Sequence, residues 1–150
     1  MILSQKGKEA LKRFEGFRSC PYLDQVKIPT IGVGTTVYPD GTLVEMHDPC
    51  IDINKAYEYL TDHVNKRVIA AIQPVIKVSL NQNQVDAVIS LVYNIGAAAF
   101  KKSTVLKKIN ENPNNKPSIT EAFMMWVKAG GTTLAVLVAR RKEELKLYFT

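Results

Sequence analysis

The sequence predicts an α+β fold in which a small N-terminal sheet precedes a larger group of helices. Residues 17–46 alternate β-branched residues with glycine and contain the turn signal PDG at 39–41, which is typical of antiparallel strands. Apolar residues recur at helical spacing along 52–74, and beyond Leu80 every periodic segment is helical. At 150 residues the chain suits a single domain, 1–150, with two lobes.

The first helix is predicted over residues 4–15. Ser4 is a good N-cap, and Gly16 is the residue type that usually ends a helix in a left-handed conformation. Glu15 therefore lies in the last helical turn. The inward face of this helix consists of Leu3, Ala10, Leu11 and Phe14.

The predicted sheet lobe, at about residues 15–50, is too thin to be stable alone. A long helix follows over about 52–74, beginning at Asp52 as N-cap and ending at Pro74, and it connects the two lobes. Its apolar face consists of Ala56, Tyr59, Leu60, His63, Val64, Val68, Ala71 and Ile72.

The helical lobe is predicted to comprise residues 75–150 together with the first helix. Its central helix begins at Asn81 and ends at Gly96, and it is apolar almost all round, which indicates burial. Three more helices are predicted over 102–112, 119–130 and 134–148. The inward stripe of the last helix is Leu134, Leu137, Val138, Leu145 and Tyr148.

Composition and charge restrict the class of protein. The chain is 46% hydrophobic and 23% charged, as soluble globular proteins are, and no apolar run approaches the ~20 residues of a membrane span. Lysines interrupt the N-terminal segment, so we expect no signal peptide and a cytoplasmic location.

The net charge of +6 arises entirely from residues 101–150, which hold ten basic and four acidic residues. This excess indicates solvated helix faces or attraction to a polyanion: nucleic acid, a membrane surface or bacterial wall polymers.

Cys20 and Cys50 are the only two cysteines. The simplest interpretation is two partly buried thiols; a disulfide requires the fold to bring them within bonding range. A metal site with His47 and His63 is the remaining alternative, but only one close pair has ligand-like spacing, whereas structural zinc sites usually show two.

Glu15 and Asp24 form a candidate acid–base pair. The helix end and the neighbouring phenylalanines favour the protonated form of Glu15, whereas a polar turn favours ionised Asp24. Thr30 follows at the start of a strand, where its hydroxyl is able to hold a water molecule beside Asp24. A carboxylic acid and a carboxylate in different environments are what glycoside hydrolysis requires.

The same stretch resembles the catalytic signature of the phage-type lysozymes, in which Glu, Asp and Thr are separated by eight and five residues. The segment LNQNQVDAVISLVYNIG, then MMWVKAGG and LVARRKEELKLY, resemble the family's central and closing elements, so the resemblance covers nearly the whole chain. Around the catalytic positions the matching residues are Gly16, Tyr22, Ile31, Gly32 and Gly34.

The resemblance implies a lysozyme-like fold and an endolysin-type muramidase. Such an enzyme hydrolyses the β-1,4 bond between N-acetylmuramic acid and N-acetylglucosamine in peptidoglycan, with inversion, and lyses the host. Glu15 would be the general acid, Asp24 the base or electrostatic partner, and Thr30 the residue that positions water. Tyr93 and Ser103 match positions that face the substrate groove in the family, and Thr36 lies opposite them in the sheet lobe, although packing or helix capping also explains all three.

The resemblance further implies peptidoglycan as the partner, with no metal and no organic cofactor. We expect a monomer that binds neither nucleic acid nor, stably, membrane. It would be stored in the host cytoplasm and released to the wall by a separate pore.

Departures from the family pattern include Lys27, where glycine is frequent; left-handed backbone there would strain lysine and affect Asp24. Val33, Thr35 and Val136 replace a frequent tyrosine, histidine and glycine.

Two other functions compete with hydrolysis. A lytic transglycosylase would need Glu15 alone and would release anhydro-muramic products. A non-catalytic basic module would bind wall polymers or nucleic acid, but it leaves the motif around Glu15 without a purpose. Arg140 and Arg141, which resemble a nucleic-acid contact, lie beside Glu143 and Glu144 and are expected to form ion pairs within and between helices.

Overall fold

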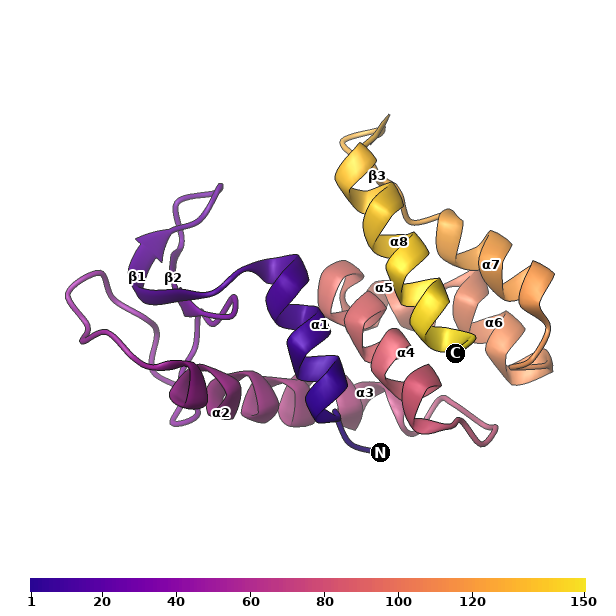
Figure 1. Ribbon diagram of the computed structural model, residues 1–150, viewed down its shortest axis with the longest axis horizontal. Coiled ribbons are helices and arrows are strands. Elements are labelled where there is room, and N and C mark those ends of the chain that lie inside the picture. Colours follow the sequence, from indigo (N-terminus) through magenta and orange to yellow (C-terminus); the bar gives the residue numbers. More distant parts are fainter.

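The computed structural model describes residues 1–150 and confirms the α+β fold class. The strands of the predicted sheet lobe lie at one end, most helices pack together at the other, and α2 runs from the first group toward the second (Figure 1). No helix is both long and apolar enough to cross a membrane.

The sheet lobe contains less regular structure than predicted. β1 (Arg18–Leu23) pairs antiparallel with β2 (Pro29–Gly32), and the rest of the predicted sheet is reduced to two isolated bridges. An irregularity in β1 shifts the register along the pair. The partners are Arg18 with Gly32, Tyr22 with Thr30 and Leu23 with Pro29, and the bridges join Ile31 with Thr35 and Val37 with Leu43.

The turn between β1 and β2 does require left-handed backbone at Lys27. Lys27 has φ +65°, and it is the only residue other than glycine with positive φ. Its N–H donates to the Asp24 carbonyl at 3.0 Å, which closes the turn. The frequent glycine of the family at this position therefore has a conformational reason, and lysine is strained here.

Lys27→Gly should raise the free energy of unfolding by about 0.5–1 kcal/mol. Removing Cβ relieves a strain of ~1–2 kcal/mol, which exceeds the ~0.5–1 kcal/mol lost to the extra freedom of glycine in the unfolded chain. Urea denaturation of both proteins measures the difference. Lys27→Ala keeps the strained Cβ and should leave the stability within about 0.5 kcal/mol of the parent; a larger gain from alanine than from glycine would contradict the strain argument.

The two cysteines form a disulfide, so the expectation of two partly buried thiols was wrong. Cys20 in β1 is bonded to Cys50, which lies just before α2, and both residues are exposed. The Ile51 N–H donates to the Ser19 carbonyl at 2.8 Å beside the bond. Pairing also removes both sulfurs from the metal-site alternative. The sequence did not reveal this because the two residues are 30 positions apart, and only the return of the chain past β1 brings them together.

The first and connecting helices begin where predicted. α1 (Gln5–Glu15) is capped by Ser4, whose hydroxyl accepts from the Gly7 N–H, and it ends at Gly16 with φ +78°. Asp52 caps α2 (Ile53–His63). The connecting helix is not uniformly α-helical, because it continues as the π-helical η1 (Val64–Ile69) and then α3 (Ala70–Ile72).

Buried α4 (Gln82–Ile95) is the centre of the helical lobe, as predicted. Asn81 and Gln84 cap it reciprocally, and Gly96 ends it. It packs against α1 and α8, and α5 (Ala97–Lys101), α6 (Thr104–Glu111) and α7 (Lys116–Met124) complete the lobe (Figure 1). Of the 24 residues in the main hydrophobic core, only Val33 comes from the sheet lobe.

The predicted helix over 119–130 is wrong at both ends. α7 begins earlier, at Lys116 with Asn115 as N-cap, and ends at Met124. The chain then forms a hairpin of β3 (Lys128–Ala129) and β4 (Thr132–Thr133). Gly130, at which the predicted helix ended, and Gly131 both have positive φ, as the two central residues of a tight hairpin turn require.

The last helix, α8 (Ala135–Tyr148), buries a different set of residues from the predicted stripe. Leu145 and Tyr148 are buried, but Leu134 is exposed. Charged residues take the inward positions instead: Arg140, Arg141 and Glu144 are all buried. Apolar periodicity could not find them, because it assigns charged residues to the solvent face.

Candidate active site

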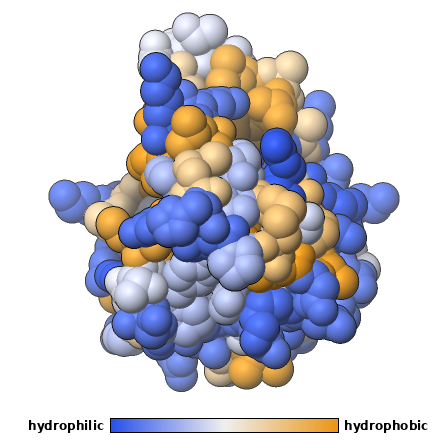
Figure 2. Space-filling view, turned by 90° about the vertical axis from the view of Figure 1, so that its left-hand side faces the viewer, coloured by the Kyte–Doolittle hydropathy of each residue, from blue (hydrophilic) through white to orange (hydrophobic).

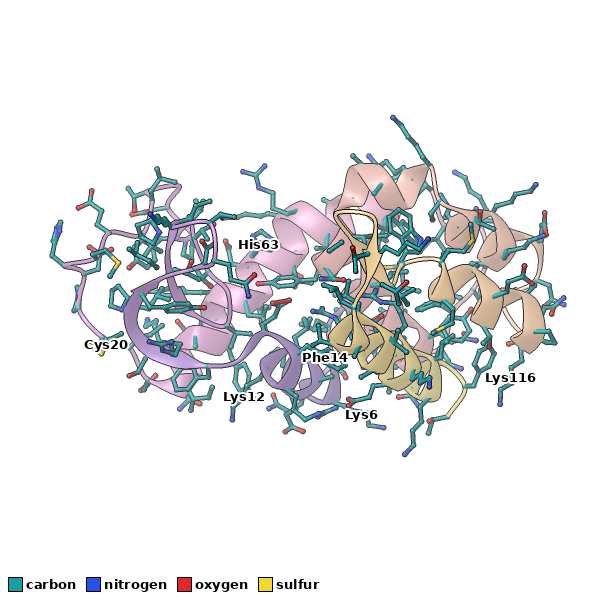
Figure 3. All side chains as sticks on the ribbon, turned by 90° about the horizontal axis from the view of Figure 1, so that it is seen from above. Lys6, Lys12, Phe14, Cys20, His63 and Lys116 are labelled. Atoms are coloured by element: carbon teal, nitrogen blue, oxygen red, sulfur yellow. A yellow bond between two sulfur atoms is a disulfide. The ribbon has the colours of Figure 1, made fainter.

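Glu15 is the last residue of α1, and its side chain points to the helical lobe. Its Oε1 lies 2.9 Å from Nη1 of Arg140, and the carboxylate side chain is 25% exposed. Phe14, beside it, lies in the middle of Figure 3 between the sheet elements, marked by Cys20, and the distal helices, marked by Lys116. The predicted catalytic acid is therefore held at the junction of the two lobes and remains open to solvent.

Arg140 is a neighbour of Glu15, a contact that the sequence analysis did not predict. Its guanidinium donates from Nη1 to Glu15, from Nη2 to the Ser90 carbonyl at 3.0 Å, and from Nε to Glu144 at 3.3 Å. Its Cζ lies 4.8 Å from the centre of the Phe14 ring. The expected ion pairs of Arg140 with α8 residues are confirmed, but the partner on α1 was not foreseen.

The Asp24 side chain is held by the turn that follows β1. Its Oδ1 accepts the N–H groups of Val26 and Ile28, both at 2.9 Å. Both bonds use Oδ1, so Oδ2 is left to accept a hydrogen bond from water.

Thr30 is buried in β2, and its hydroxyl donates to the Ile28 carbonyl at 2.8 Å. That bond occupies the hydroxyl proton and turns the oxygen into an acceptor. Ile28 thus connects the two residues, because its N–H binds Asp24 while its carbonyl binds Thr30.

Two tyrosines in this part of the molecule have raised pKa values. Burial raises the pKa of Tyr22 in β1; the charges of Glu15 and Asp24 add to the increase, whereas Arg18 opposes it. Burial also raises the pKa of Tyr93 in α4, and the charge of Glu15 adds to it. The charges of both Glu15 and Asp24 therefore act on Tyr22, whereas of the two only that of Glu15 acts on Tyr93.

The predicted substrate-binding residues are in three different settings. Tyr93 joins the lobes, because its hydroxyl donates to the Val33 carbonyl at 2.9 Å and its ring contacts His63 of α2 edge-on. Ser103 caps α6: its hydroxyl accepts the Leu106 N–H at 3.1 Å and donates to the Phe100 carbonyl. Thr36 is half-buried in the sheet lobe. A contact of any of the three with substrate stays a prediction.

One other group of side chains has the composition of a metal site. Glu45, His47 and Asp48 place one ligand atom each within 4.8 Å of one another in an exposed turn. Asp48 already accepts hydrogen bonds from the Tyr38 hydroxyl and the Glu45 N–H. These contacts account for the turn, and the group lies apart from Glu15 and Asp24 in the chain.

Comparison with known proteins identifies the family. The endolysin of Salmonella phage P22 is 41% identical over 150 residues, which is 100% of this chain and 99% of that protein. The crystal structure of a P22 lysozyme mutant superposes with a TM-score of 0.88 over 100% of this chain and 99% of that one, at 41% identity. The endolysin of Escherichia coli O157:H7 phage FAHEc1 gives a TM-score of 0.88 at 39% identity, covering 99% and 93% of the two chains. The sequence profile described as phage lysozyme matches residues 12–144, and this chain therefore belongs to the phage lysozyme family.

Proposed function

We propose that this muramidase hydrolyses peptidoglycan with Glu15 as general acid and Asp24 as the base that activates water. Membership of the phage lysozyme family and 41% identity to an endolysin support the activity. The single observation that supports these roles is the placement of the two carboxyl groups around Tyr22: Glu15 lies 25% exposed at the end of α1, Asp24 accepts two backbone N–H groups in the turn after β1, and the charges of both act on Tyr22. Glycoside hydrolysis uses a pair of carboxyl groups that flank the bond to be cleaved.

In the proposed mechanism Glu15 protonates the glycosidic oxygen while water attacks the opposite face of the sugar. That water would donate to Oδ2 of Asp24 and to the Thr30 oxygen, both of which are available as acceptors. Attack by water rather than by Asp24 inverts the anomeric centre. No metal or organic cofactor takes part in these steps.

The surroundings of the reaction are part of the proposal. A single lysozyme domain acts as a monomer, and the glycan lies between the sheet and helical lobes. The positive charge concentrated in residues 101–150 favours approach to an anionic wall. Storage in the host cytoplasm and release by a separate pore would bring the enzyme to that substrate.

Product analysis tests the roles and separates hydrolysis from the transglycosylase alternative. Purified peptidoglycan digested by the parent protein should gain one reducing end per bond cleaved and no anhydro-muramic ends. Asp24→Asn should lower the rate by about 100-fold or more, because amide nitrogen and oxygen activate water poorly. Asp40→Asn is a matched control, since Asp40 also accepts a backbone N–H, from Thr42 at 2.9 Å, in another turn of the sheet lobe. A parental rate in Asp24→Asn, or anhydro products, would contradict the hydrolytic mechanism.

A further inference from the structure

Glu144 is a buried carboxylate that the proposed reaction does not use. Its side chain is fully buried in α8 between two arginines: Oε2 accepts from Arg140 Nε at 3.3 Å, and Oε1 lies 2.9 Å from Arg141 Nη1. The Ser90 hydroxyl of α4 donates to Oε2 at 2.6 Å. Arg141 reaches in turn to the Asn94 side chain. Such a group requires an explanation, because burying charges costs more than most ion pairs return.

The contacts of Arg140 connect Glu144 to Glu15. Arg140 donates to both carboxylates with different nitrogens of one planar group, and it is buried. The Ser90 carbonyl accepts a third hydrogen bond from this guanidinium, and the Phe14 ring packs on the guanidinium face. The orientation that Arg140 presents to Glu15 therefore depends on its anchor at Glu144.

The charges of the same cluster determine how easily Glu15 takes up a proton. With both carboxylates ionised, Glu15 and Glu144 balance Arg140 and Arg141, and protonation of Glu15 leaves one positive charge. Without the charge of Glu144, the cluster would be positive before Glu15 takes up its proton and doubly positive afterwards. A second uncompensated charge in a buried site is costly, so Glu144 makes the protonated acid accessible.

Other charged groups surround the cluster. Burial raises the pKa of Glu144, while Arg141, Ser90 and Arg140 oppose the increase. Tyr93 of α4 and Tyr22 of β1 face Glu15 from the remaining elements, and Asp24 and Arg18 act on Tyr22. Glu144 also lines a cavity of about 390 Å³ between α1 and α8, and the other charged side chains of that cavity are Lys6, Arg13, Glu143 and Lys146.

We propose that Glu144 is a positioning residue for the reaction: it anchors Arg140 against Glu15, and its negative charge allows Glu15 to hold a proton while Arg140 remains in contact. The inference rests on the proposed role of Glu15 as the general acid. The proposal gives a function to the buried ion pair of Glu144 and Arg140, which α8 does not need in order to form a helix.

The test measures the titration of Glu15 and the pH profile of hydrolysis in Glu144→Gln. A general acid is active while protonated, so activity is lost as pH rises through its titration. Because a neutral amide at this position leaves the arginines uncompensated, Glu15 should ionise more readily in the variant, and the alkaline limb of kcat/KM should move to lower pH by about one unit. The carboxyl ¹³C resonance of Glu15, assigned by its loss in Glu15→Gln, should show the same shift in its titration midpoint.

Three further variants complete the design. Glu144→Asp keeps the negative charge, so the alkaline limb of its kcat/KM profile should lie at the same pH as in the parent protein. Glu143→Gln is the matched control, since Glu143 is exposed and its ion-pair partner is Arg13, at 3.7 Å. The alkaline limb of its pH profile should not move. If Glu144→Gln does not fold, Ser90→Ala is the deciding variant. Without the hydrogen bond from Ser90, Glu144 is neutral over a wider pH range. The alkaline limb of kcat/KM should therefore move in the same direction as in Glu144→Gln, but by less.

The outcomes separate this inference from the proposed function. The role of Glu144 would be overturned if the parent protein is active but Glu144→Gln leaves both the alkaline limb of kcat/KM and the titration midpoint of Glu15 unchanged. Where Glu144→Gln does not fold, the same result in Ser90→Ala would overturn it. An inactive parent protein whose Glu15 midpoint still shifts in the variant would overturn the proposed function and leave the charge coupling supported.

Discussion

Glu15→Gln is expected to lower the rate of peptidoglycan hydrolysis about 1,000-fold. Glutamine has the shape of glutamate, and its carbonyl oxygen can still accept the 2.9 Å bond from Arg140, so the junction of the lobes should be preserved. It has no acidic proton to give to the leaving oxygen. The rate is measured as the loss of turbidity of bacteria whose outer membrane has been permeabilised, together with reducing ends released from purified wall.

Glu9→Gln is the control for this substitution. Glu9 is a second glutamate of α1 but is exposed, and its change should leave the rate unaltered. Both variants should unfold at temperatures within a few degrees of the parent, which shows that lost activity is not lost structure. Equal clearing by the parent and by Glu15→Gln would refute the assignment of Glu15 and with it the proposed mechanism.

Reduction of the Cys20–Cys50 disulfide should destabilise the sheet lobe by about 3 kcal/mol. The bond joins residues 30 positions apart, and a loop of that length loses much conformational freedom when it is closed in the unfolded chain. The loop includes Asp24 and Thr30, so the turn that we propose to be catalytic lies within it. The lobe has little apolar packing to compensate, since it contributes only Val33 to the main core.

The surface of the sheet lobe agrees with this weak packing. Apolar side chains reach the surface among polar ones at this end of the molecule (Figure 2). The large apolar residues exposed in the lobe are Leu23, Val26, Ile28, Leu43 and Met46.

Hydrogen exchange measures the effect of reduction where it is expected. With a thiol reductant, amides bonded between β1 and β2 should exchange about 100-fold faster, because each 1.4 kcal/mol is tenfold. Amides of buried α4 should change less. A Cys20→Ala, Cys50→Ala double variant should exchange as fast as the parent protein with its disulfide reduced. Adding the reductant to this variant should not change its exchange rate. Unchanged exchange in the strands of the reduced parent protein would show that the disulfide does not support the lobe.

The sequence by itself determined where helices begin and end when a local signal marks the boundary. Ser4, Asp52 and Asn81 cap the helices for which they were predicted, and Gly16 and Gly96 end them, because capping depends on residues within one turn of each other. The position of Glu15 at a helix end follows from the same local rules, whereas the left-handed backbone at Lys27 was suggested only by the glycine that is frequent there in the resembled family. Where two local signals compete the prediction failed: Gly130 and Gly131 suited a helix stop and a hairpin turn equally well.

Only the tertiary structure decided which distant residues meet. The pairing of Cys20 with Cys50, the contact of Arg140 with Glu15 and the burial of Glu144 join segments up to 125 positions apart. Hydrophobic periodicity places charged residues at the surface. It therefore cannot predict a buried arginine whose desolvation cost is offset by two carboxylates from different helices. The environment that sets the chemistry of Glu15 therefore arises from how α1, α4 and α8 pack together, and no local pattern in the chain records it.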